Sequence, residues 1–122
     1  MKTMKVLVVD DEKSITSYLQ RKLDKLGYVV CVAEDGEEAL DQAFSRLPDL
    51  ILLDIKLPRL SGIEVCERLK SDEKTKDIPI LMLSAKAQSE EIEEGLKAGA
   101  DKYLCKPMGF PDILKEIQAF VN

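Results

Sequence analysis

The sequence predicts a doubly wound α/β fold, in which helices cover both faces of a five-stranded parallel sheet. Five short apolar runs, rich in β-branched residues, each precede a longer segment whose apolar residues recur at helical spacing, a (βα)5 pattern. The run over 50–53 is apolar at every position, as a central strand buried on both faces must be. A chain of 122 residues with 45% hydrophobic residues can bury its own core. We therefore expect one domain over residues 1–122.

The first two strands are expected over 5–9 and 28–33, each followed by an amphipathic helix. The first helix ends at Gly27, and the second begins at Asp35, which can cap it together with Glu38. The apolar residues expected on the buried stripes of these helices are Ile15, Tyr18, Leu19, Leu23, Leu26, Leu40, Ala43, Phe44 and Leu47.

The second half of the chain repeats this order, with strands expected over 50–53, 80–83 and 102–105. Ser61 and Glu64 form a capping box that opens a short helix after the third strand. A helix over about 89–98 follows the fourth strand, and Gly99 closes it. Pro111 is well placed as the first residue of the last helix.

Composition and charge argue against several classes of protein. The net charge of −5, without any basic run, argues against direct nucleic-acid binding by this segment. The apolar runs are too short to cross a bilayer, and no secretory signal precedes Asp10. Cys31, Cys66 and Cys105 lack a CxxC spacing and lie in apolar stretches, which predicts buried, reduced thiols. We expect a cytoplasmic domain that does not contact a membrane.

Polar side chains follow four of the predicted strands. Asp10 and Asp11 follow the first strand, Asp54 the third, Ser84 the fourth and Lys106 the fifth. In an open parallel sheet, ligands bind beyond the carboxyl ends of the strands. If the first and third strands are neighbours, the three carboxylates converge and repel one another by a few kcal/mol per close pair. Such a cluster requires a cation.

Two cations could meet that need, namely Lys106 and a bound divalent ion. An all-oxygen site without His or Cys suits Mg²⁺, which binds one or two carboxylates together with a substrate phosphate. This combination indicates phosphoryl transfer, in which Lys106 clamps phosphoryl oxygens and Ser84 donates a hydrogen bond. Asp54 is then the natural nucleophile, forming an acyl phosphate, and Asp10 and Asp11 are metal ligands.

Several spaced motifs lie at these strand ends. They are VVDDE at 8–12, DLILLDIKLP at 49–58, SGIEV at 61–65, SAK at 84–86, GADKYL at 99–104 and the pair Lys106 and Pro107. Any one of them is a weak signal, but they occur in order and at the expected strand ends. Over residues 5–121 the sequence resembles the receiver domains of bacterial two-component response regulators.

The resemblance implies a flavodoxin-like sheet of strand order 2-1-3-4-5. Asp54 would be the phosphoacceptor. Asp10, Asp11, Asp54 and the backbone carbonyl of Lys56 would bind Mg²⁺, for which Mn²⁺ or Ca²⁺ could substitute. Lys106 would pair with the phosphoryl group, held by a bend at Pro107 that is commonly a cis peptide in this family.

The resemblance also implies a signalling role. Asp54 would accept a phosphoryl group from the phosphohistidine of a sensor histidine kinase or a phosphotransfer protein. Ser84 and Tyr103 match the family's switch pair, whose movement repacks the face made by the fourth helix, fifth strand and fifth helix. That face would act on a downstream protein or a tethered output domain. The domain would be a monomer or a phosphorylation-dependent homodimer. The domain would catalyse only its own phosphorylation and dephosphorylation.

Several of these candidate site residues also have a purely structural interpretation. Asp10 could cap the first helix, Lys106 could be a surface lysine, and Ser84 could be a turn hydroxyl. Tyr103 could be a packing residue of a half-covered strand. Glu12 reads as a solvated acid in the first helical turn.

Other functional classes fit less well. A haloacid-dehalogenase-type phosphatase needs a DxD after the first strand, where this chain has adjacent Asp10 and Asp11. A flavodoxin-like cofactor binder is disfavoured because the acidic first loop would repel a flavin phosphate. A receiver-like scaffold without phosphate chemistry would not need the complete acceptor set. Four positions depart from the family pattern, namely Lys56, Lys86, Met108 and Gly109.

Overall fold

Strands and helices alternate along the whole chain of the computed structural model, which describes residues 3–85 and 88–121. Lys86 therefore lies outside the described residues. The elements are β1 (Lys5–Val9), α1 (Lys13–Lys25), β2 (Val29–Ala33), α2 (Gly36–Arg46), β3 (Leu50–Leu53), α3 (Gly62–Lys70), β4 (Ile80–Ser84), α4 (Ser89–Lys97), β5 (Lys102–Cys105) and α5 (Phe110–Phe120). None of the helices in the described part of the chain is long and apolar enough to span a membrane.

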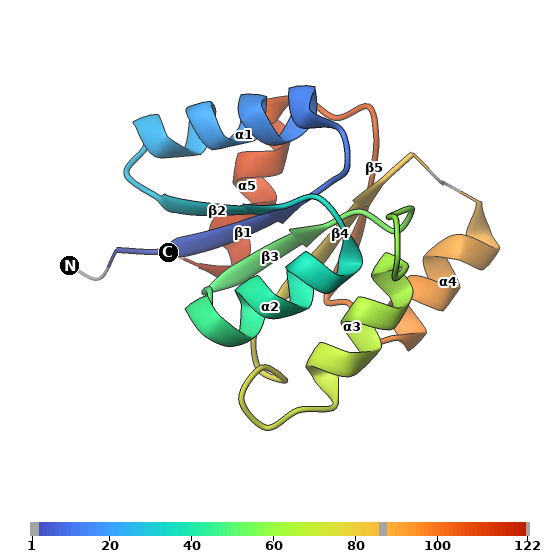
Figure 1. Cartoon of the computed structure of the whole chain (residues 1–122). Helices are drawn as coiled ribbons and strands as arrows, with labels where there is room; N and C mark the ends of the chain where they lie inside the picture. Colours follow the sequence, from blue (N-terminus) through green and yellow to red (C-terminus); the bar gives the residue numbers. More distant parts are fainter. Residues whose placement is uncertain (1–2, 86–87, 122) are drawn as a thin grey trace.

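The five strands form one parallel sheet of order β2-β1-β3-β4-β5. Helices α1 and α5 cover one face, and α2, α3 and α4 cover the other (Figure 1). Leu50 and Leu52 of β3 face the α1 and α5 side, while Ile51 and Leu53 face the opposite side. The two-sided burial of β3 confirms the doubly wound fold that its unbroken apolar run predicts.

The predicted helix caps are present. Asp35 accepts a hydrogen bond from the Glu38 backbone N–H at 2.8 Å, and Ser61 accepts one from the Glu64 N–H at 3.3 Å. Asp10 does not cap α1, because the N-cap position belongs to Glu12. The carboxylate of Asp10 instead accepts the Glu12 N–H at 3.0 Å, which leaves the carboxylate in the loop after β1.

Three element boundaries differ from the sequence prediction by one residue. β2 begins at Val29 because the Tyr28 N–H donates to the carbonyl of Leu23 in α1. β4 extends to Ser84, which pairs with Cys105 of β5. α5 begins at Phe110, one residue before Pro111. The shift that matters for the site is the second, because it places Ser84 inside the sheet.

Some residues predicted to be buried are exposed. Leu26 and Leu47 are 53% and 47% exposed because they are the C-cap residues of α1 and α2, beyond the last turn that faces the sheet. Tyr18 and Phe44 also keep more than a third of their surface exposed. Cys31 and Cys66 are buried as predicted, but Cys105 is exposed at the end of edge strand β5.

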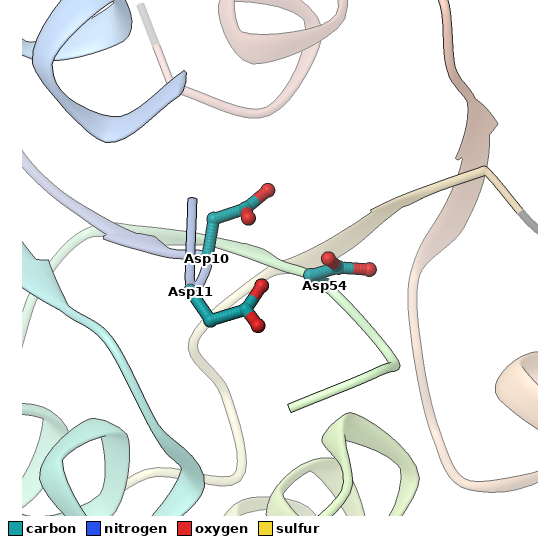
Figure 2. A group of neighbouring side chains, drawn as sticks. All are labelled: Asp10, Asp11 and Asp54. Atoms are coloured by element: carbon teal, nitrogen blue, oxygen red, sulfur yellow. The ribbon is translucent and has the colours of Figure 1, made fainter. Parts of the chain in front are cut away.

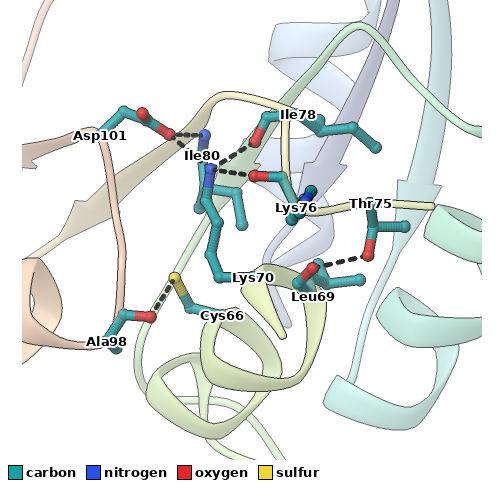
Figure 3. A network of polar contacts seen from close by, with 9 residues as sticks. All are labelled: Cys66, Leu69, Lys70, Thr75, Lys76, Ile78, Ile80, Ala98 and Asp101. Atoms are coloured by element: carbon teal, nitrogen blue, oxygen red, sulfur yellow. Dashed lines mark hydrogen bonds and ion pairs between the residues drawn. The ribbon is translucent and has the colours of Figure 1, made fainter. Parts of the chain in front are cut away.

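The amino end of β4 is held by a polar network that sequence reasoning did not anticipate (Figure 3). The Lys70 ammonium donates to the carbonyls of Lys76 and Ile78 at 3.2 and 2.8 Å and to the Asp101 carboxylate at 3.0 Å. The same Asp101 oxygen accepts the N–H of Ile80 at 2.8 Å. Lys70 thus joins the loop before β4 to the loop before β5.

Candidate functional site

Adjacent strands bring the predicted acidic residues together. The Asp10 N–H donates to Ala33 of β2 at 3.1 Å, and the Asp54 N–H donates to Val9 of β1 at 3.0 Å, so the backbone pairing continues just past the strand ends. Asp10, Asp11 and Asp54 gather at this carboxyl edge (Figure 2). One oxygen from each lies within 4.8 Å of the other two. Asp10 and Asp54 are buried, while Asp11 is exposed.

Lys106 reaches this cluster from β5. Its backbone N–H donates to the Ser84 carbonyl at 2.9 Å, and the Lys106–Pro107 peptide bond is cis, as the resemblance implies. Its ammonium donates to Asp10 at 2.6 Å and to Asp54 at 3.4 Å. Lys106 is therefore not a free surface lysine, since its side chain is only 17% exposed and bonded to both buried carboxylates.

Burial and neighbouring charges shift the protonation of this pair. Burial raises the pKa of Asp54, and the charge of Asp10 adds to that increase. The charge and hydrogen bond of Lys106 oppose it only in part. Burial lowers the pKa of Lys106, but the hydrogen bond to Asp10 and both carboxylate charges raise it more, so its pKa is above the ordinary value. One ammonium group thus faces three carboxyl groups, an arrangement that favours a further cation.

A cavity of about 520 Å³ opens over the cluster. It is lined by Asp11, Glu12, Asp54, Lys56, Leu57, Pro58, Ser84, Ala85 and Lys106. The resemblance drew attention to the backbone of Lys56, whereas the structure also places this residue and Glu12 in the cavity wall. Carboxylate oxygens in an open cavity suit a hard cation such as Mg²⁺, which retains several waters and binds phosphate oxygens.

Gly62 fixes the loop beside Asp54, a role that sequence reasoning missed. A Cβ atom at this position would collide with the backbone carbonyl of Asp54. The Gly62 N–H donates to the Ile55 carbonyl at 2.7 Å, which folds the loop after β3 back onto the start of α3. The sequence feature that could have indicated this role is the glycine directly after the cap residue Ser61 in the SGIEV motif.

Ser84 and Tyr103 lie next to each other, on paired strands. Ser84 is buried at the end of β4, and the Tyr103 ring packs against Gly95 of α4, where a Cβ atom would lie 3.0 Å from the ring. Burial raises the pKa of Tyr103, and a side-chain hydrogen bond with Ser84 lowers it because a donated proton stabilises the phenolate. Tyr103 therefore packs against the core and also contacts Ser84. Its packing role is confirmed, and its role as a switch residue stays a prediction.

Comparisons of sequence point to one family. The sequence model of the response regulator receiver domain matches residues 6–118. PhoP of Bacillus subtilis, an alkaline phosphatase synthesis transcriptional regulatory protein, is 46% identical over 118 residues, covering 97% of this chain and 48% of PhoP. Response regulator MprA of Mycobacterium avium is 44% identical over 119 residues, covering 98% of this chain and 51% of MprA. The chain thus spans about half the length of these curated relatives.

Solved structures share the fold over nearly the entire chain. The chemotaxis response regulator CheY4 of Vibrio cholerae has a TM-score of 0.92 and 35% identity, covering 98% of this chain and 100% of CheY4. A receiver domain of DrrB, activated with BeF3, has a TM-score of 0.88 and 30% identity, covering 98% of both chains. Since sequence, strand order and acidic edge agree, this chain belongs to the receiver domain family of two-component response regulators, which are signalling domains.

Proposed function

We propose that residues 1–122 form a receiver domain that takes a phosphoryl group onto Asp54 from the phosphohistidine of a sensor histidine kinase or a phosphotransfer protein. The observation that carries this proposal is the cluster of Asp10, Asp11 and Asp54 within 4.8 Å, with the Lys106 ammonium 3.4 Å from an Asp54 oxygen. Of the three carboxylates, Asp54 is the one that is buried, lines the cavity and also contacts the Lys106 ammonium.

In the proposed reaction, an Asp54 carboxylate oxygen attacks the phosphorus of the phosphohistidine. The new P–O bond gives an acyl phosphate while the P–N bond breaks, leaving the electron pair on the histidine. Lys106 stays beside Asp54 and neutralises the phosphoryl oxygens, and Ser84 donates a hydrogen bond to one of them. Water later cleaves the P–O bond and releases inorganic phosphate. In both steps the group of this chain that changes is Asp54, so the domain catalyses only its own phosphorylation and dephosphorylation.

A metal site completes this proposal. Asp10, Asp11, Asp54 and the backbone carbonyl of Lys56 would hold Mg²⁺, and Mn²⁺ or Ca²⁺ could substitute. Bound Mg²⁺ supplies positive charge next to the phosphoryl oxygens. Lys106 alone leaves the three carboxyl groups short of positive charge, and this excess supports the assignment.

Phosphorylation would then act as a charge switch. It adds about −1.5 to −2 charge and three acceptor oxygens beside Ser84 and Lys106. Drawing the Ser84 hydroxyl onto a phosphoryl oxygen removes it from Tyr103, whose ring already packs on α4. The face of α4, β5 and α5 is therefore the surface whose packing would change, and the phosphoryl group shifts a two-state equilibrium.

Partners and output follow from the same proposal. Relatives of about twice the length, one of them named a transcriptional regulatory protein, support a tethered output domain. A stand-alone receiver acting on a downstream protein is the alternative. We propose that this domain works in the cytoplasm without direct contact with nucleic acid or membrane, as a monomer or a phosphorylation-dependent homodimer.

The experiment that tests this function is intact-mass measurement after incubation with acetyl phosphate and Mg²⁺. We expect a gain of about 80 Da, the mass of one phosphoryl group, that hydroxylamine removes and that requires Asp54. The matched variants are Asp54→Asn and Asp41→Asn, the latter at an exposed aspartate of α2. A mass gain that persists in Asp54→Asn would overturn the proposal, and modification at Asp10 would favour the phosphatase class instead.

A further inference from the structure

One carboxylate outside the cluster of Asp10, Asp11 and Asp54, that of Glu91, lies on the helix that packs on Tyr103. Glu91 lies in the first turn of α4, and its Oε2 atom is buried without a hydrogen-bond partner among the described residues. An unpaired buried carboxylate oxygen is costly. Glu90 in the same turn is exposed to water, so a glutamate at this end of α4 is not buried by its position in the turn alone.

Tyr103 of β5 offers a hydroxyl donor on the side of the sheet that α4 covers. Gly95, against which the Tyr103 ring packs, is four residues after Glu91 and so lies on the same face of α4. The Glu91 charge acts on the Tyr103 hydroxyl, raising the pKa of that group. The same hydroxyl also accepts a hydrogen bond from Ser84, and the charge of Asp54 raises its pKa. Tyr103 therefore lies between the acidic site and α4.

We propose that Glu91 is a positioning residue of the switch, whose buried carboxylate oxygen accepts the Tyr103 hydroxyl proton in a hydrogen bond when Ser84 turns to the phosphoryl group. This inference rests on the proposed phosphorylation of Asp54. Ser84 donates its hydrogen bond to the Tyr103 oxygen, so the Tyr103 proton is available to a second acceptor, and the departure of Ser84 frees the hydroxyl to turn toward one. Added negative charge at Asp54 also makes an unpaired carboxylate nearby more costly. One charge-assisted hydrogen bond from the Tyr103 hydroxyl gives the Glu91 oxygen a partner and joins the first turn of α4 to β5.

A purely structural role makes a different prediction. A carboxylate in the first turn of a helix interacts favourably with the helix dipole, whatever residue faces it. That contribution would be the same with tyrosine or phenylalanine at position 103. Only a hydrogen bond with the Tyr103 hydroxyl makes the effect of Glu91 depend on that hydroxyl and on the phosphorylated state.

The test is a double-mutant cycle read by NMR, with beryllofluoride and Mg²⁺ as the phosphoryl mimic. The readout is the ratio of switched to unswitched signals from Gly95 and residue 103. We expect Glu91→Ala to lower that ratio by at least about tenfold, the effect of one hydrogen bond to a charged group. Glu91→Gln keeps an acceptor oxygen and should lose less, and the matched control Glu90→Ala should match the wild type. In a Tyr103→Phe background, Glu91→Ala should cause no further loss.

The possible outcomes separate this inference from the proposed function. Equal losses from Glu91→Ala with and without the Tyr103 hydroxyl, or no loss beyond that of Glu90→Ala, would overturn the role of Glu91 alone. The proposed function would survive, because phosphorylation of the wild type by acetyl phosphate reports it independently. Absence of both phosphorylation and beryllofluoride response in the wild type would overturn the function and the inference together.

Discussion

Lys70 and Lys106 each bind carboxylate at one end of the sheet, yet their surroundings differ. At the amino end, the Lys70 ammonium bonds to one carboxylate, Asp101, and to two backbone carbonyls. At the carboxyl end, the Lys106 ammonium bonds to Asp10 and Asp54, and an oxygen of a third carboxylate, Asp11, lies within 4.8 Å of an oxygen of each. Both lysine side chains are nearly equally exposed, at 18% and 17%. Burial therefore does not distinguish the two sites.

Charge balance and access distinguish them. The Lys70 cluster is neutral, and its three donated bonds end on atoms of the protein, so it joins two loops and requires nothing from outside. The Lys106 cluster has more carboxylates than cations and lies beside a cavity of about 520 Å³. The difference teaches that a lysine and carboxylate pair is structural where its charges cancel, and open to ligands where they do not.

The largest expected effect is the loss of the balanced cluster. Lys70→Met should lower the free energy of unfolding by about 3 kcal/mol, because it removes the ammonium of this cluster, which balances the Asp101 charge and donates to two backbone carbonyls. Urea unfolding measures this, with Lys74→Met as the control at an exposed lysine of the loop that follows α3. Phosphorylation of the surviving folded protein should be retained. A change below that of Lys74→Met would contradict the structural role of Lys70.

Metal should act only at the unbalanced cluster. Mg²⁺ at about 100 times its dissociation constant should stabilise the wild type by about 2.7 kcal/mol, because it binds only the folded chain. Removal with EDTA should abolish this gain, and Asp10→Asn should lose most of it. Thermal unfolding with and without Mg²⁺ is the measurement, and Asp41→Asn should respond as the wild type does. An equal response in Asp10→Asn would place the ion elsewhere.

Without metal, the unbalanced cluster should cost stability. The pKa of Asp54 in the folded chain is raised above 3.8, so the folded chain holds this proton more tightly than the unfolded chain does. The stabilisation that the proton gives is fully present below pH 3.8 and is lost as the pH rises through the pKa of Asp54 in the folded chain. Asp54→Asn should therefore be more stable than the wild type at pH 7, on the order of 1 kcal/mol. Urea unfolding at pH 4 and pH 7 in EDTA should show this difference growing with pH. A constant or shrinking difference would contradict the repulsion.

The smallest expected effect is the alkaline titration of Lys106. Its pKa in the folded chain is raised above 10.5, so its stabilising contribution is present below that pH and is lost as the pH rises through the folded value. The stability difference between wild type and Lys106→Met should shrink above pH 10.5, by less than about 1 kcal/mol because the side chain is partly solvated. Unfolding at pH 9 and pH 11 checks this, and a growing difference would refute it.

Much of the fold could be predicted from local pattern. The five strands lie where short apolar runs occur, and the caps at Asp35 and Ser61 form as expected. The errors occur where a local pattern meets an element end, as for Leu26 and Leu47, or a sheet edge, as for Cys105. Apolar spacing reports which face of a helix is buried, but it does not report where the covering surface stops.

The site divides in the same way. Sequence alone determined that carboxylates follow the first and third strands and that Lys106 follows the fifth, because these are facts of order along the chain. Their convergence depended on tertiary structure, since Lys106 and Asp10 are 96 positions apart and meet only through the strand order. The contact of Lys70 with Asp101 and the burial of the Glu91 Oε2 atom likewise depend on packing between elements. Periodicity acts within one element, whereas contacts between distant side chains depend on how the elements pack.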